Sequence, residues 1–265
     1  IRNEIAKSAS GVTRYNISKA SFRKIQIPIP PLDVQAKIVK ILDAFTALTA
    51  ELTAELTMRE KQYHYYRDNL LTFSDDEVEW KTLGEIGEVR MCKRILKNQT
   101  SDSGDIPFYK IGTFGKQADA FISHSLFKEY MEKYNYPKTG EILISASGTI
   151  GRTVIFDGKD AYFQDSNIVW IENDEKKVLN KFLFYYYQIT NWGASEGGTI
   201  SRLYNDNLRK IRIPVPSKNE QKRIVNFLEK FETLTNSITE GLPKEIALRQ
   251  KQYECYREQL LDFPK

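Results

Sequence analysis

One long segment occurs twice in the sequence, and this repeat limits what the chain can fold into more than any other feature. Residues 23–49 and 209–235 are identical at 13 of 27 aligned positions, and residues 59–73 match residues 249–263 at 9 of 15. The first pair of segments is offset by 186 residues and the second by 190, so the second copy carries 190 − 186 = 4 extra residues. Such a match indicates one structural unit that is used twice.

Each copy predicts a short extended segment followed by a helix. Alternating prolines in residues 25–30 and 211–216 exclude a helix there, because proline lacks a backbone donor and restricts the residue before it. In the second copy, Ser217 is expected to cap the next helix, with Glu220 completing a capping box. In the first copy, Asp33 is the expected cap.

Apolar residues then recur seven apart, which predicts two long helices that pack on each other. The first is expected to run without a break from about Asp33 to about Leu71, a length of roughly 55–60 Å. In the second, Gly241 and Pro243 predict a kink or a loop. The residues expected to pair the helices are Ile38, Phe45, Leu48, Leu52, Leu56, Ile224, Phe227, Phe231 and Leu234.

The geometry of that pairing has two interpretations. Antiparallel pairing within one chain is favoured, because the block between the helices is long enough for a globular domain whose two ends connect to them. The alternative is a homodimer in which each helix pairs separately with its copy.

Residues 80–216 predict a mixed α/β domain between the helices. Asp157–Gly158 indicates a hairpin turn between two of its strands. The expected strands are Ile106–Ile111, Glu141–Ser145, Thr153–Phe156, Ala161–Phe163 and Ile168–Ile171. The expected helices are Leu126–Tyr134 and Leu179–Ile189. The fold class is therefore α+β: this domain, flanked by two long helices in an antiparallel coiled coil.

Four polar clusters fall at turns of this domain, and each mixes cations with hydroxyls or amides. Arg, Lys, Asn and Gln side chains suit purine edges in the major groove, whereas hydroxyls and loop amides suit phosphates. The alternative is that each cluster is an ordinary solvated turn. The candidate DNA-binding residues are Lys93, Arg94, Lys97, Lys110, Ser147, Thr149, Arg152, Gln164, Ser166, Asn167, Thr199, Ser201, Arg202 and Tyr204.

Composition sets further limits on function. A net charge of +4 permits nucleic-acid binding without requiring it. The sequence has no membrane-length apolar run, and its two cysteines form neither a disulfide framework nor a zinc spacing, so a cytoplasmic protein without metal or cofactor is expected. No catalytic motif is recognisable beyond a loose nuclease-like pattern at Asp165, Glu175 and Lys177, a pattern common by chance in a charged chain.

The doubled signature resembles the specificity subunits of type I restriction-modification systems. The residues that carry the resemblance are Ile27–Val39 with Lys61–Arg67, and their repeat in Ile213–Val225 with Lys251–Arg257. Segments 80–86, 140–145 and 147–151 are similar to recurrent parts of the family's recognition domains. The resemblance covers nearly the whole chain.

This resemblance implies a non-catalytic subunit that reads one half of a bipartite site in double-stranded DNA. Its paired helices would dock methyltransferase subunits, restriction subunits would join through the complex, and a half-length form could self-associate. Residues 1–32 would be the tail of a preceding recognition domain, 33–73 the first conserved helix, 80–216 the target-recognition domain and 217–263 the second conserved helical region. The alternatives are a stand-alone nuclease and a coiled-coil scaffold without a DNA role.

Overall fold

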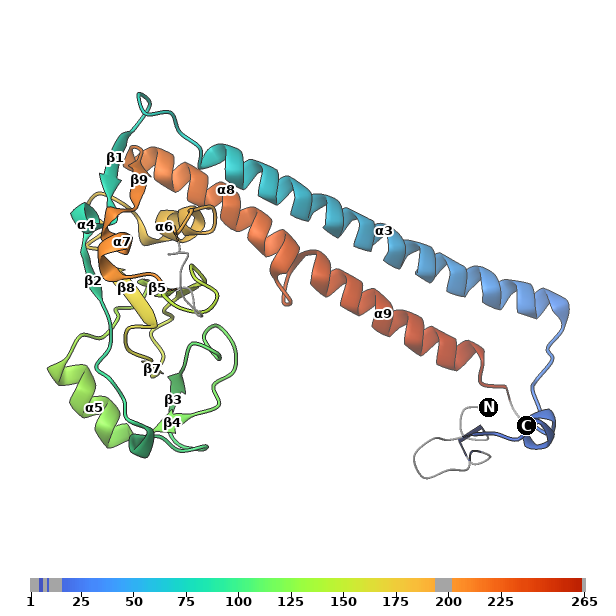
Figure 1. Ribbon diagram of the computed structural model, residues 1–265. Helices are drawn as coiled ribbons and strands as arrows, with labels where there is room; N and C mark the ends of the chain where they lie inside the picture. The colour runs from blue at the N-terminus through green and yellow to red at the C-terminus, as the bar shows by residue number, and fades with distance from the viewer. Residues whose placement is uncertain (1–4, 7–8, 10–15, 194–201, 264–265) are drawn as a thin grey trace. The chain divides into compact units, whose positions relative to one another are not determined.

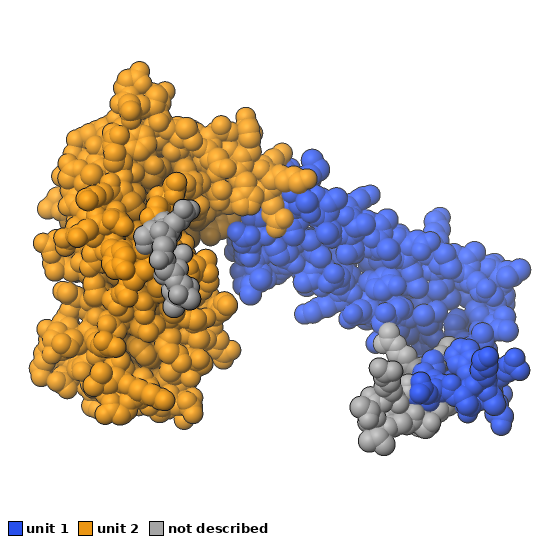
Figure 2. Space-filling model, in the orientation of Figure 1, with its two compact units in different colours: residues 1–59, 233–265 blue, residues 60–232 orange. Residues whose placement is uncertain are grey.

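The computed structural model describes residues 5–6, 9, 16–193 and 202–263. The chain forms two compact units, residues 1–59 with 233–265 and residues 60–232 (Figure 2). The second unit is larger than the predicted domain 80–216, because it includes the ends of both long helices. Tyr63 from the first helix, Leu71 just after it, and Ile224 and Leu228 from the second are buried in its core.

The long helices are continuous over most of the predicted ranges (Figure 1). Helix α3 spans Leu32–Leu70, one residue from the expected bounds at either end, and follows the short helix α2 (Lys19–Arg23). Asp33 lies inside the first turn of α3 and is not its cap, because the helix already begins at Leu32. In the second copy, α8 (Lys218–Asn236) and α9 (Gly241–Leu260) are separate helices.

The break between α8 and α9 confirms the interruption that the sequence predicts. Gly241 has a φ of +73°, and a Cβ there would lie 2.5 Å from the carbonyl oxygen of Thr233, so glycine is required. Pro243 lies in the first turn of α9, where its missing donor has no helical partner to lose. At the start of α8, the backbone N–H of Glu220 donates to Ser217 Oγ at 3.3 Å, as predicted. The Glu220 carboxylate instead accepts from Arg223.

The helices pack against each other in antiparallel fashion within each unit. In the first unit, the ring of Phe45 from the early part of α3 stacks on Tyr256 from the end of α9, 5.1 Å between centroids. In the second unit, Tyr66 near the end of α3 meets Phe227 and Phe231 of α8 at 5.4 and 5.8 Å. These contacts join segments of one chain, as the intramolecular interpretation expects. Ile38 and Ile224 are buried, whereas Leu48, Leu52, Leu56 and Leu234 are half-buried.

The described residues of the second unit form three small sheets. β1 (Glu79–Thr82) pairs antiparallel with β9 (Arg212–Val215). A four-stranded antiparallel sheet has the order β2 (Glu88–Arg90), β8 (Ile168–Glu172), β5 (Ile142–Ser145) and β6 (Thr153–Ile155). A three-stranded sheet has the order β4 (Phe121–Ile122), β3 (Ile106–Tyr109) and β7 (Tyr162–Phe163). Besides its parts of α3 and α8, the described residues of this unit form the helices α4 (Leu83–Ile86), α5 (His124–Lys133), α6 (Asn180–Tyr187) and α7 (Asn205–Lys210), with a 3₁₀ turn at Lys97–Gln99.

The four-stranded sheet is buried on both faces, which explains the unbroken apolar runs of its central strands. Along β8, Val169 and Ile171 enter one core cluster, together with residues of α6 and α8, whereas Ile168 and Trp170 enter a second cluster with β3 and α5. Successive strand residues point to opposite faces, so one strand contributes to both cores.

The predicted hairpin at Asp157–Gly158 is wrong. β6 before this turn pairs with β5, and β7 after it pairs in parallel with β3, so the turn connects two different sheets. The local chemistry is nevertheless that of a tight turn. Gly158 has a φ of +83°, and Asp157 Oδ1 accepts from the backbone N–H of Lys159 at 3.0 Å.

Candidate nucleic-acid interface

Three of the four predicted polar clusters meet at one end of the four-stranded sheet. Ser147, just after β5, forms an isolated antiparallel bridge with Arg202, and its Oγ donates to Asn167 Oδ1 at 2.9 Å. The backbone N–H of Leu203 donates to the carbonyl of Ala146 at 2.8 Å. Segments from three distant parts of the sequence are therefore fixed side by side through backbone and side-chain hydrogen bonds.

Two of these segments, around Ser166 and around Arg202, border an open cleft of about 420 Å³. The Arg202 guanidinium lies 5.9 Å from the centre of the Tyr204 ring, and its Nη2 donates to the carbonyl of Ser166 at 3.4 Å. Tyr204 is 57% exposed, so its ring is accessible from solvent. The residues that line the cleft are Met91, Ser166, Arg202, Leu203, Tyr204, Asn205, Asp206 and Arg209. Cations, an amide, a hydroxyl and an exposed ring in one cleft suit contacts with nucleic acid.

The backbone at Ser166 helps to form this cleft. Ser166 has a φ of +53°, a left-handed conformation that is uncommon outside glycine. In the tight turn around it, the backbone N–H of Asn167 donates to the carbonyl of Asp165 at 2.6 Å. This turn leads into β8 and directs the Ser166 carbonyl toward Arg202, so strained backbone is found at the cleft itself.

Arg152 and Gln164 both anchor the neighbouring loop at residues 110–116. Arg152 Nη1 donates to the carbonyl of Phe114 at 2.9 Å, and Gln164 Oε1 accepts from the backbone N–H of Ile111 at 2.9 Å. Lys110 pairs with Asp119 at 2.9 Å, and Thr149 is exposed in the loop between β5 and β6. These contacts are structural, and DNA contact by these side chains stays a prediction.

The fourth cluster, Lys93, Arg94 and Lys97, makes its described contacts elsewhere. The Lys93 ammonium lies 5.0 Å from the ring centre of Tyr134, at the end of α5, and its backbone N–H donates to Tyr162 Oη. Arg94 and Lys97 are exposed. Thr199 and Ser201 lie outside the described residues.

Sequence reasoning missed several residues of the cleft. Arg209 was considered only as part of the repeat, where Arg23 is its counterpart. Met91 and Asn205 reach the cleft from the ends of β2 and α7, and only the fold shows this. Arg209 could have been predicted from its position, because it lies in the helical segment that directly follows the Arg202–Tyr204 cluster.

The nuclease-like pattern does not form a site. Asp165 precedes β8 and Glu175 follows it, so the five-residue strand separates them by about 16 Å at ~3.3 Å per residue. Glu175 Oε1 accepts from the backbone N–H of Asn180 at the start of α6, and the Lys177 carbonyl accepts from Gln221. Among the described residues, no group of three His, Cys, Asp or Glu side chains could hold a metal ion.

The thiol of Cys92 is not suited to act as a nucleophile. Burial raises the pKa of its thiol to about 12, so the thiolate is not formed at neutral pH. Within the described residues, no helix is both long enough and apolar enough to cross a membrane.

Comparison with known proteins identifies the class that this fold and cleft define. A family model described as the type I restriction modification DNA specificity domain matches residues 1–58 and 75–248. The chain therefore belongs to the family of type I restriction-modification DNA specificity subunits, which recognise DNA sequences and are not themselves catalytic.

Individual relatives agree with that assignment. The chain is 64% identical over 262 residues to a putative type I restriction enzyme specificity subunit, S.HindORF215P, of Haemophilus influenzae, covering 96% of the chain and 68% of the relative. It is 42% identical over 269 residues to the EcoR124I/EcoR124II specificity subunit of Escherichia coli, covering 94% of the chain and 65% of the relative. The chain thus spans about two thirds of the length of these relatives.

The fold is shared with a solved structure despite low sequence identity. The crystal structure of the HsdS subunit from Thermoanaerobacter tengcongensis superposes with a TM-score of 0.62 at 16% identity, covering 98% of the chain and 66% of that structure. This likeness supports the α+β architecture with its long paired helices.

Proposed function

We propose that residues 80–216 read one half of a bipartite site in double-stranded DNA. The observation that carries this proposal is that Ser166 and Arg202 line one cleft, while Ser147 and Asn167 hold the segments beside it. Arg202 is the strongest candidate for a base contact, because a guanidinium can make two hydrogen bonds to guanine. Exposed Arg209 and the exposed Tyr204 suit the phosphate backbone.

The other half of the site would be read by a second recognition domain seated on the first repeat. Gln35 donates to the carbonyl of Pro30 at 2.7 Å, as its counterpart Gln221 donates to Pro216 at 2.8 Å. Ile213 is fully buried in the second unit, whereas its counterpart Ile27 is 61% exposed. These matching contacts and the exposed apolar face support residues 1–32 as the end of another such domain.

The paired helices would dock methyltransferase subunits, with restriction subunits joining through the complex. A groove of about 850 Å³ in the first unit supports this, because small side chains along α3 leave room for a partner helix beside α9. The residues that line the groove are Thr46, Thr49, Ala50, Thr53, Ala54, Thr57, Gln250, Tyr253, Glu254 and Arg257.

Selection from a pool of random duplexes by the full chain tests the reading proposal. We expect a short enriched sequence of about the length of one half-site, with affinity that falls steeply as salt rises, because phosphate contacts release counterions. Binding that is weak, salt-insensitive and without enrichment would favour a scaffold without a DNA role. Magnesium-dependent cleavage of the duplexes by the chain alone would instead favour a nuclease.

A further inference from the structure

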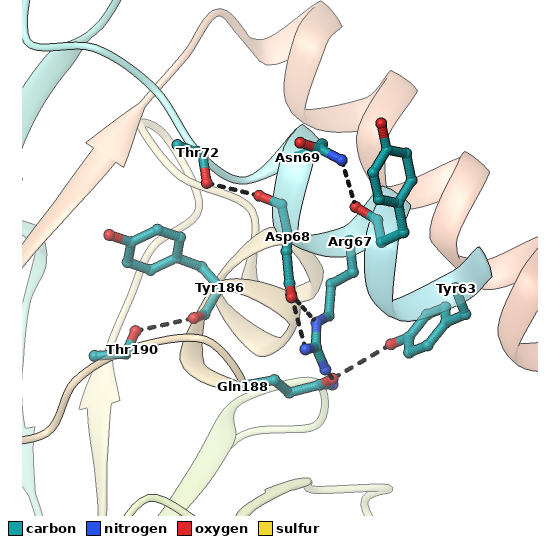
Figure 3. Close-up of polar contacts among 9 residues, drawn as sticks. Tyr63, Arg67, Asp68, Asn69, Thr72, Tyr186, Gln188 and Thr190 are labelled. Atoms are coloured by element: carbon teal, nitrogen blue, oxygen red, sulfur yellow. Dashed lines mark hydrogen bonds and ion pairs between the residues drawn. The ribbon is translucent and has the colours of Figure 1, made fainter. Parts of the chain in front are cut away.

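A polar cluster joins the end of α3 to the end of α6 in the second unit (Figure 3). Gln188 directly follows α6, and its Oε1 accepts from Tyr63 Oη at 3.3 Å and from Arg67 Nη1 at 3.5 Å. Asp68 holds the same guanidinium through Nε at 2.9 Å and Nη2 at 2.8 Å. One amide oxygen of the recognition domain is thus shared by two donors of the long helix.

The other long helix holds α6 through a second set of polar contacts. Tyr185 Oη donates to Glu232 Oε2 of α8 at 2.7 Å, and Lys181 pairs with Glu229 of the same helix. Burial raises the pKa of Tyr63, and the charge of Glu232 adds to this rise. Tyr63 therefore keeps its proton at neutral pH and remains a hydrogen-bond donor to Gln188.

Apolar packing alone does not fix how α6 sits on the two helices. The shared core contains Tyr63, Leu71, Ile224 and Leu228, and burial of these side chains is non-directional. Aliphatic cores can repack with small shifts, whereas a hydrogen bond weakens steeply as its geometry changes. The polar contacts, those at Gln188 with α3 and those of Tyr185 and Lys181 with α8, are therefore able to set the orientation of the domain.

The repeat contains a second copy of the Tyr63–Arg67 pair, and among the described residues this copy forms without a glutamine partner. Tyr253 and Arg257 of α9 are the counterparts of Tyr63 and Arg67. Arg257 lies 5.7 Å from the Tyr253 ring centre, and Arg67 lies 5.8 Å from that of Tyr63. In the described part of the first unit, the Tyr253 and Arg257 side chains hydrogen-bond to no glutamine. The pair is therefore preformed by the helix sequence.

We propose that Tyr63, Arg67 and Gln188 form a latch that sets the angular register of the recognition domain on the helix pair. Tyr63 and Arg67 are the receptor, and the ligand is the side-chain carboxamide at the end of a recognition-domain helix. The register would determine where the Arg202 cleft faces relative to the helices. This last consequence rests on the proposed function, whereas the latch itself can be tested without DNA.

Distance measurements between spin labels on the full chain test the latch. Labels are placed at Lys61→Cys on α3 and Lys128→Cys on α5, both exposed, in a Cys255→Ser background, and buried Cys92 is left in place. We expect Gln188→Ala and Tyr63→Phe to broaden the distance distribution at least about twofold, with a melting temperature within about 4 °C of the parent, as loss of two weak hydrogen bonds or of one implies. Gln188→Glu, which keeps an acceptor opposite Arg67, should retain the narrow distribution.

Tyr253→Phe is the matched control, because it removes the same hydroxyl from the second copy. An unchanged distribution in Gln188→Ala and Tyr63→Phe, or equal broadening in Tyr253→Phe, would overturn the latch. Tyr63→Phe loses a single oxygen, so it gives a result even if Gln188→Ala perturbs folding. A parent chain that selects no DNA sequence while its latch variants still broaden the distribution would refute the reading proposal alone.

Discussion

Gln221→Leu is expected to lower the free energy of unfolding by about 3 kcal/mol, because it leaves several buried backbone groups without partners. Gln221 is 0% exposed. Its Nε2 donates to the carbonyls of Lys177 and Pro216 at 2.9 and 2.8 Å, and its Oε1 accepts from the backbone N–H of Leu179 at 2.8 Å. Leucine has a similar volume but can replace none of these bonds. Equilibrium denaturation in urea at neutral pH measures the difference.

Gln35→Leu is the matched control for this substitution. Gln35 occupies the same position in the first copy of the repeat and makes the same contact with the proline five residues before it, at 2.7 Å. It is only partly buried, so water can replace that partner and the expected loss is about 1 kcal/mol or less. Equal losses in the two variants would show that Gln221 does not join the recognition domain to α8 as described.

Arg202→Ala is expected to weaken binding to the selected duplex by about 5- to 150-fold, the range of about 1–3 kcal/mol for a lost bidentate base contact. The reason is the position of the guanidinium, which lies over Tyr204 and bonds to the Ser166 carbonyl at the cleft. The loss should be largest at one base position, so discrimination there falls as well. Gel-shift titrations at one fixed salt concentration, with single-base variants of the duplex, measure both effects.

Lys159→Ala removes the same charge from a place where no DNA contact is expected. Lys159 lies in the turn that follows β6, whereas the loop of Ser147 precedes β6, so the two are at opposite ends of that strand. Its effect on affinity should be about twofold or less, since an exposed charge acts mainly through screened long-range attraction. A loss that is the same for Arg202→Ala and Lys159→Ala, and uniform over all duplexes, would remove Arg202 from base reading.

Much of the helical architecture could be predicted because its causes are local. The heptad pattern gave the bounds of α3 to within one residue, and Gly241 with Pro243 marked the break between α8 and α9. The unbroken apolar runs around β5 and β8 likewise predicted strands, because both faces of their sheet are buried.

The pairing of strands could not be predicted, because it depends on partners far away in sequence. Asp157–Gly158 has the residues of a hairpin turn, yet the strand after it, β7, pairs with β3 and not with β6. β1 pairs with β9 more than a hundred residues later, and the proline-rich pattern showed only that β9 is extended.

The same limit applies to the candidate site. Sequence reasoning found polar turns, but only the fold brings Ser147, Asn167 and Arg202 together and directs Gln164 and Arg152 to a neighbouring loop. Polar residue type alone cannot separate these two outcomes, since each side chain can bond to either backbone or DNA. The hydrogen-bond partners that each side chain has in the folded structure distinguish the two outcomes.

The central claim is that this chain gives DNA sequence specificity to a methyltransferase complex. Mapping of methylated bases across the genome, in matched strains with and without the gene, tests it most directly. We predict a bipartite motif that is methylated only when the gene is present and that loses or relaxes one half in Arg202→Ala. An identical methylation pattern in the two strains, with the methyltransferase subunits present in both, would contradict it.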